Sequence, residues 1–128
     1  MVKTKRVYEP RENSDGTRIL VMRLWPRGIR RDRVDEWNRD LAPSRELLFS
    51  FKRRGLPWAD YVTRYWEEIP PQALDELRRR ARRETITLLC SCPDENRCHR
   101  GLLRDAVAKR TRSTQRRKGT AGGRRAIG

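Results

Sequence analysis

The chain has 128 residues, of which 35% are apolar and 38% charged, and its net charge is +15 at pH 7. This length fits one domain with a modest core, and no apolar run approaches the roughly 20 residues of a membrane helix, which argues against a membrane protein. Met1 is followed by no apolar leader, and three cysteines cannot all pair with one another, so a cytoplasmic protein with free thiols is expected.

Two strands are predicted near the N-terminus. The alternating stretch TKRVYEP, residues 4–10, favours a first strand. Asp15 and Gly16 indicate a turn, because glycine readily adopts left-handed backbone. The stretch RILVMRL, from Arg18 to Leu24, contains four successive apolar residues and is typical of a buried strand. The WPRG stretch then breaks regular structure.

Helices are predicted in the middle of the chain. Val34, Trp37 and Leu41 are spaced as on one helix face, which predicts a helix that ends at the following Ala-Pro pair. A second helix is expected between an N-cap at Ser44 and a stop at Gly55. Two further helices are predicted over residues 57–69 and 70–84.

The second buried strand and the last helix enclose all the cysteines. TITLLCS, residues 85–91, is a strand pattern, PDENR is a turn, and CHRGLLRDAVAKR returns to helical spacing. Two buried strands separated by helices predict a parallel pair. The expected fold is therefore a compact single α/β domain over residues 1–108, with a small parallel sheet flanked by helices.

Residues 109–128 form a basic tail with eight Lys or Arg and no Asp or Glu. The tail has no aromatic residue and no periodic apolar pattern, so we expect it to be disordered. Its charge favours contact with nucleic acid through phosphate groups, although a purely solubilising role is the simpler alternative.

An arginine-rich pocket is predicted where the two buried strands end, because ligands of parallel sheets bind beyond the carboxyl ends of the strands. Arg23, Trp25 and Arg27 follow the first buried strand, and Arg100 follows the second. Arginine and the N-terminus of the last helix both favour a phosphate or carboxylate group. The alternative is that the arginines pair with acidic residues of neighbouring helices.

The three cysteines and the single histidine lie within ten positions, and three interpretations stay open. In the first, Cys98 is a catalytic nucleophile at a helix start, with His99 beside it. In the second, zinc is bound by Cys90, Cys92, Cys98 and His99. In the third, Cys90 and Cys92 are small core residues.

Four stretches occur in an order that resembles a known family: DGTRILVMRLWPRGIRRD, WNRDLAPS, FSFKRRG and ITLLCSCPDENRCHRGLL. They are similar to the domain of unknown function family 488, close to its YeaO-like branch, from about Lys5 to Val107. The family's motif positions fall on Arg23, Trp25, Pro26, Arg27, Gly28, Trp37, Ala42, Pro43 and Ser44. Many YeaO-like members have a cysteine-free last strand followed by His-Asn, whereas this chain has Cys-His-Arg, as in other branches. The resemblance implies a compact α/β fold and no particular activity.

The leading hypothesis is a protein that binds, and in one version processes, a phosphorylated, nucleotide-like or nucleic-acid anion in the arginine-rich pocket. A non-catalytic nucleic-acid accessory domain that binds through its tail is the first alternative. A small zinc module is the second.

Overall fold

The computed structural model describes residues 1–108. The predicted basic tail, 109–128, lies outside the described residues, so its disorder and its contact with nucleic acid stay predictions. In the described part, no helix is both long and apolar enough to cross a membrane.

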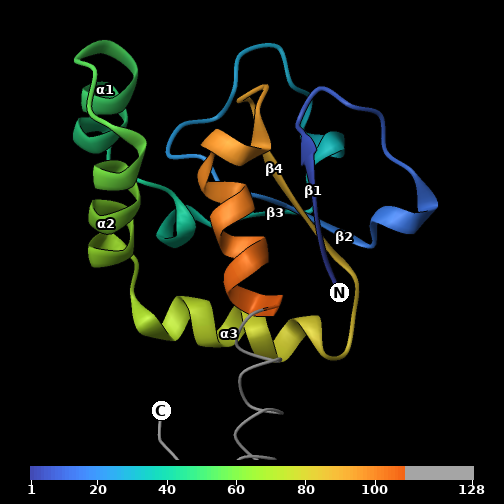
Figure 1. Ribbon diagram of the computed structural model, residues 1–128. Helices are drawn as coiled ribbons and strands as arrows, with labels where there is room; N and C mark the ends of the chain where they lie inside the picture. The colour runs from blue at the N-terminus through green and yellow to red at the C-terminus, as the bar shows by residue number, and fades with distance from the viewer. Residues whose placement is uncertain (109–128) are drawn as a thin grey trace, which may run out of the picture.

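The centre of the fold is a parallel sheet of four strands in the order β1-β4-β2-β3 (Figure 1). The strands are β1 Val2–Arg6, β2 Thr17–Leu20, β3 Glu36–Trp37 and β4 Ile86–Cys90. β4 lies between β1 and β2 and all five of its residues are buried. They include Thr87, whose hydroxyl donates to the Asp15 carbonyl at 2.7 Å. The predicted parallel pair of buried strands is confirmed.

In the part of the chain that the structure describes, four α-helices accompany the sheet. They are α1 Arg45–Arg53, α2 Trp58–Glu68, α3 Pro71–Ala81 and a last helix over residues 99–108. The Ser44 side chain accepts a hydrogen bond of 3.0 Å from the Leu47 N–H, which confirms the predicted N-cap. Short 3-10 turns complete the chain: η1 Asn13–Asp15, η2 Arg31–Arg33, η3 Arg39–Leu41 and η4 Glu95–Arg97.

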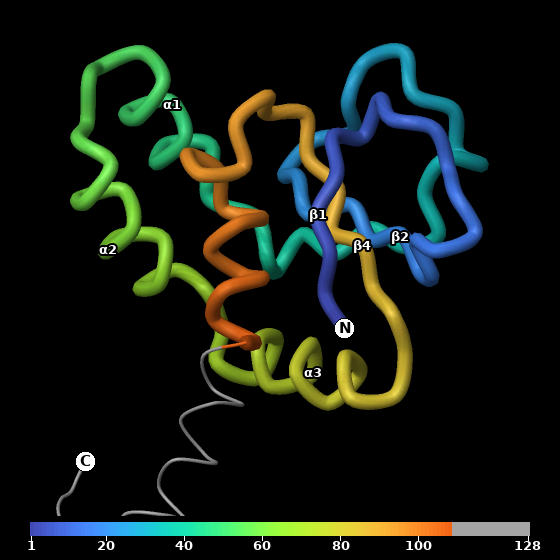
Figure 2. The backbone as a smooth tube through the Cα atoms, turned by 45° about the vertical axis from the view of Figure 1, so that its right-hand side comes forward, coloured from blue at the N-terminus to red at the C-terminus, as the bar shows by residue number. Residues whose placement is uncertain are grey.

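The two faces of the sheet are covered differently. Figure 2 shows the helices on one side and the irregular connections on the other. Ile19 and Leu88 face the helices and join the main core with Tyr61 and Tyr65 of α2. Their neighbours in the strands face the opposite way and pack against the connection between β2 and β3; that smaller cluster is formed by Val7, Leu20, Leu89, Met22, Trp25, Ile29, Val34 and Trp37.

The prediction of a helix from the spacing of Val34, Trp37 and Leu41 is wrong. Residues 36 and 37 form β3 instead, since the Asp35 N–H donates to the Arg18 carbonyl and the Asn38 N–H to the Leu20 carbonyl, both at 2.9 Å. Trp37 packs on the far face of the sheet while Leu41 enters the main core. Pairing with the edge of β2 therefore overrides a spacing that is compatible with a helix.

Candidate functional site

The two loops predicted to converge leave the same edge of the sheet. β2 and β4 are parallel neighbours, with Leu20 opposite Leu89, and the Val21 N–H donates to the Leu89 carbonyl at 3.0 Å. Both strands therefore end at one level, and the chain after each faces α1 and the start of the last helix. This arrangement is the one expected of a ligand site in a parallel sheet.

A cavity of about 330 Å³ opens at this edge. β4 and the residues directly after it contribute Cys90, Ser91 and Cys92, and the last helix contributes His99. The remaining lining residues come from the loop after β2, from the segment before α1 and from α1: Met22, Arg23, Leu24, Pro43, Arg45, Leu48, Phe49, Lys52 and Arg53. Within residues 1–108, no Asp or Glu lines it.

Within residues 1–108, the four cations of the cavity have no Asp or Glu partner. Arg23 donates to the carbonyls of Ala42 at 3.0 Å and Pro43 at 3.3 Å, which fixes its side chain without neutralising it. Arg45 and Arg53 are exposed, and neither forms an ion pair with a described residue. The alternative in which Arg23 is neutralised by a neighbouring helix is therefore not seen in this structure.

One wall of the cavity is apolar and open to solvent. Leu24 is 57% exposed and Phe49 is 50% exposed. Leu48 and Met22 continue this wall inward. The cavity thus combines cations with an apolar surface, the pairing that a ligand with a charged end and an uncharged ring requires.

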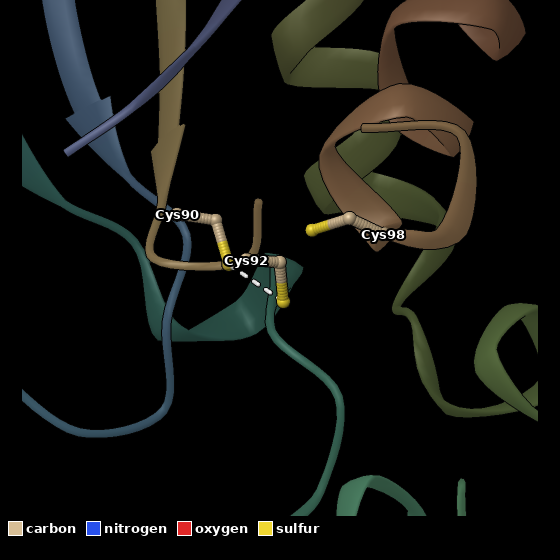
Figure 3. A group of neighbouring side chains, drawn as sticks. All are labelled: Cys90, Cys92 and Cys98. Carbon is tan, nitrogen blue, oxygen red and sulfur yellow. Dashed lines mark hydrogen bonds between the residues drawn. The ribbon is translucent and has the colours of Figure 1, made fainter. Parts of the chain in front are cut away.

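The three cysteines meet at the floor of the cavity, where Cys90 and Cys92 line it and Cys98 adjoins them. Their Sγ atoms all lie within 4.8 Å of one another, and those of Cys90 and Cys92 are 3.8 Å apart. Figure 3 shows Cys90 and Cys92 at the end of β4, with the side chain of Cys98 pointing toward them. All three are free thiols, and three sulfur atoms at these separations can hold a metal ion.

The environment favours ionisation of one thiol over the others. Hydrogen bonds from Cys90 and Cys98, with the Lys52 ammonium 3.3 Å away, lower the pKa of Cys92 well below its ordinary value. Hydrogen bonds to Cys90 and Cys92, together with burial, raise the pKa of Cys98. The sequence points to Cys98 as the reactive thiol at a helix start. In the structure Cys98 is extended, precedes the helix and does not line the cavity, whereas Cys92 does.

His99 is buried beside the thiols. Burial lowers its pKa to about 4, so the ring is neutral at pH 7. Its Nε2 faces the Val21 carbonyl, which only accepts hydrogen bonds, and Nε2 therefore carries the proton. The unprotonated Nδ1 lies 3.7 Å from the Sγ of Cys98.

The other predicted anion ligands lie elsewhere. Arg100 is buried and donates to the Cys92 carbonyl at 2.8 Å, so it supports the thiol loop from behind. The Trp25 indole donates to the Ile29 carbonyl at 2.8 Å and packs edge-on against Trp37, on the far face of the sheet. Arg27 is exposed and does not line the cavity.

Sequence reasoning missed the residues that α1 contributes. Arg45, Lys52 and Arg53 fall in the helix predicted between Ser44 and Gly55, but no role in the site was predicted for them. Lys52 meets Cys92 across forty positions of the chain. The cluster of basic residues at the end of α1 was the one visible signal, and such clusters also arise from the helix dipole.

Comparisons with known proteins connect this geometry to a family. The family model described as "Active DUF488-N3 subclade" (DUF488-N3a) matches residues 2–111. The chain is 37% identical over 108 residues to the uncharacterized protein YeaO of Escherichia coli K12, covering 81% of this chain and 94% of that protein. It is 38% identical over 105 residues to the uncharacterized protein Rv3073c of Mycobacterium tuberculosis H37Rv, covering 80% and 89% respectively. No solved structure matches.

Proposed function

The chain belongs to the DUF488 family, and we propose that its cavity binds a small phosphorylated ligand of the nucleotide type. The observation that carries the proposal is the ring of four cations, Arg23, Arg45, Lys52 and Arg53, around a cavity with no acidic lining residue among those described. Guanidinium groups donate in pairs to phosphate oxygens, and such charge-assisted bonds are stronger than neutral ones.

The apolar wall supports a ligand larger than phosphate alone. A volume of about 330 Å³ lies at the small end of ligand pockets, which favours one nucleotide-sized molecule over a polymer. The exposed side chains of Leu24 and Phe49 supply an apolar surface for a base or another flat ring, while the arginines hold the anionic end. The Arg54 guanidinium also lies over the Phe49 ring, 5.2 Å from its centroid. The proposal is one of binding, with any chemistry left to the thiols at the floor.

The free thiols also bear on the compartment. Three buried cysteines without a disulfide fit a reducing environment, and a cytoplasmic location is part of the proposal.

The test is a titration of the full-length chain with adenosine monophosphate, inorganic phosphate and adenosine, by calorimetry at constant salt. We expect the nucleotide to bind more tightly than phosphate, and adenosine to bind least. Arg45→Ala and Arg53→Ala should each weaken nucleotide binding by about tenfold, since each removes a charge-assisted hydrogen bond.

Arg64→Ala is the matched control. Arg64 is exposed on α2, forms no ion pair with a described residue and does not line the cavity, so its loss removes the same charge without touching the site. Its effect should stay below about twofold, as expected for a distant surface charge. Equal losses in all three variants would show that the nucleotide responds only to net charge, and the absence of saturable binding would also overturn the proposal.

A further inference from the structure

We infer that Cys90, Cys92 and Cys98 together bind one zinc ion at the floor of the cavity. The inference stands on the geometry of the thiols and does not require the proposed function to be correct. Only the three cysteines form a group of potential metal ligands within residues 1–108, and no acidic residue joins them.

The distances suit a single ion. Two sulfur ligands of one tetrahedral zinc lie about 3.8 Å apart, because each zinc–sulfur bond is about 2.3 Å long. The Sγ atoms of Cys90 and Cys92 are already 3.8 Å apart, and all three pairs lie within 4.8 Å. Each sulfur therefore needs to move by less than about 1 Å to close around the ion.

The backbone holds the three ligands from two sides. Cys90 is the last residue of β4 and Cys92 follows it by two positions, and their side chains belong to one cluster. Cys98 returns from the turn η4, and the Gly101 N–H fixes its carbonyl at 3.1 Å as the last helix begins. A site anchored at a strand end and a helix start is largely preorganised for a metal.

The surrounding charge fits a metal bound by thiolates. Three thiolates and one Zn²⁺ carry a net charge of −1. Arg100 is buried, its Nη1 contacts the Cys92 carbonyl, and its Nε has no hydrogen-bond partner. Lys52 Nζ lies 3.3 Å from the Sγ of Cys92, and neither cation forms an ion pair with a described carboxylate. The negative charge of the thiolate sulfur atoms balances these two cations, which have no carboxylate partner among the described residues.

The ligand type selects the metal. Thiolate sulfur favours zinc and other soft ions over magnesium and calcium, which require oxygen ligands. His99 is not part of this close group of potential ligands, although its Nδ1 lies 3.7 Å from the Sγ of Cys98. The fourth coordination position instead opens to the cavity that Cys90 and Cys92 line.

The experiment titrates the full-length chain, kept reduced with a phosphine, with Co²⁺ as a spectroscopic substitute for zinc in phosphate-free buffer. We expect saturation at one equivalent, with a sulfur-to-cobalt charge-transfer band and the visible bands of tetrahedral cobalt, and full displacement by Zn²⁺. Zinc should also protect all three thiols from alkylation. Cys90→Ser, Cys92→Ser and Cys98→Ser should each weaken cobalt binding by at least about tenfold.

Ser91→Ala is the matched control, because Ser91 lies between two of the ligands and lines the same cavity. Its cobalt spectrum and affinity should match those of the unaltered chain. The inference is overturned if the unaltered reduced chain shows no sulfur-to-cobalt band at one equivalent, a measurement that does not depend on how the variants fold. Nucleotide binding by the zinc-free chain is measured separately, so the failure of one proposal leaves the other intact.

Discussion

At the scale of single residues, the most constrained charge lies on the face of the sheet opposite the cavity. Asp15 and Arg18 are both 0% exposed, and their side chains meet at 2.7 Å. Arg18 also donates to the carbonyls of Arg33 at 2.8 Å and Glu9 at 3.1 Å. One guanidinium thus ties β2 to both irregular connections that cover this face.

Removing one partner of this pair should be costly. Asp15→Asn leaves the buried Arg18 without its counter-charge, and we expect the free energy of unfolding to fall by about 3 kcal/mol. Urea unfolding at pH 7 measures the change. Asp32→Asn is the comparison, since Asp32 pairs with Arg30 on the surface, where both side chains are more than 60% exposed. That change should cost less than about 0.5 kcal/mol, and equal costs would contradict the assignment.

These residue roles show where sequence reasoning ends. The turn at Asp15 and Gly16 was predictable, because the residue types that permit a turn act locally. The partners of Asp15 were not, since the Lys5 and Arg18 contacts depend on how η1 folds back over the sheet. The same holds for Lys52 and Cys92, which meet only after α1 packs beside the end of β4.

At the scale of elements, the packing of the last helix against η4 depends on one glycine. A Cβ atom at Gly101 would lie 2.3 Å from the Glu95 carbonyl oxygen. Backbone atoms have no alternative rotamer, so either the helix or η4 would have to move. Cys98 lies between these two elements, and its position therefore depends on the same close approach.

Gly101→Ala tests this contact by the sign of its effect. In an unobstructed helix, alanine is more favourable than glycine by about 1 kcal/mol. Here we expect the opposite, a loss of about 1–3 kcal/mol, because the methyl group overpacks the contact with η4. Thermal and urea unfolding both report the change. A variant more stable than the unaltered chain would show that the close approach is not a constraint.

Elements that depend on local sequence signals could be predicted, whereas an element that forms only by pairing with the edge of another strand could not. The start of α1 follows from Ser44, whose hydroxyl caps the helix within its own turn. The strand β3 has only two residues, and it exists because β2 offers a free edge to it. No periodicity encodes that edge, and the spacing of Val34, Trp37 and Leu41 was therefore assigned to a helix.

At the scale of the whole molecule, ion pairs connect one element of the fold to another. Arg80 of α3 holds Glu36 of β3 through two hydrogen bonds of 2.7 and 2.8 Å. Glu95 of η4 pairs with Arg104 at 3.0 Å. The hydrogen bonds from Arg80 lower the pKa of Glu36, and the Thr4 hydroxyl and Arg104 do the same for Glu95. Several of the carboxylates therefore stabilise the fold only while they are ionised.

The general architecture could be predicted from the sequence, and the site could be predicted only in part. Alternating buried strands and helices imply a parallel α/β layer, and the shared edge of β2 and β4 follows from it. Arg23 and the cysteines could be placed at that edge from their positions after the strands. The sequence does not predict that helices alone cover one face of the sheet. This covering places Arg23 at the cavity, whereas Trp25 packs on the far face.

The lowered pKa values of the carboxyl groups in ion pairs predict that the molecule loses stability in acid. Burial opposes ionisation of Asp15, but hydrogen bonds from the Glu12 N–H, Lys5 and Arg18 outweigh it and lower its pKa to about 2. A carboxyl whose pKa is lower when folded stabilises the fold above its unfolded pKa, near 3.8, and loses that contribution as the pH falls toward 2. Asp15 alone accounts for about 2 kcal/mol over this window.

The other carboxyl groups whose pKa is lowered act in the same direction. Their protonation adds to the positive charge of a chain that already carries +15 at pH 7. We therefore expect the free energy of unfolding, measured in urea at constant ionic strength, to be nearly constant from pH 7 to 5 and to fall steeply from pH 4 to 2. The Asp15→Asn variant, measured over the same series, isolates the largest contribution. Its deficit relative to the unaltered chain should shrink as the pH drops below about 4, because protonation removes the same charge from Asp15. A deficit that stays constant down to pH 2 would mean that the Asp15 carboxylate is not the group that titrates.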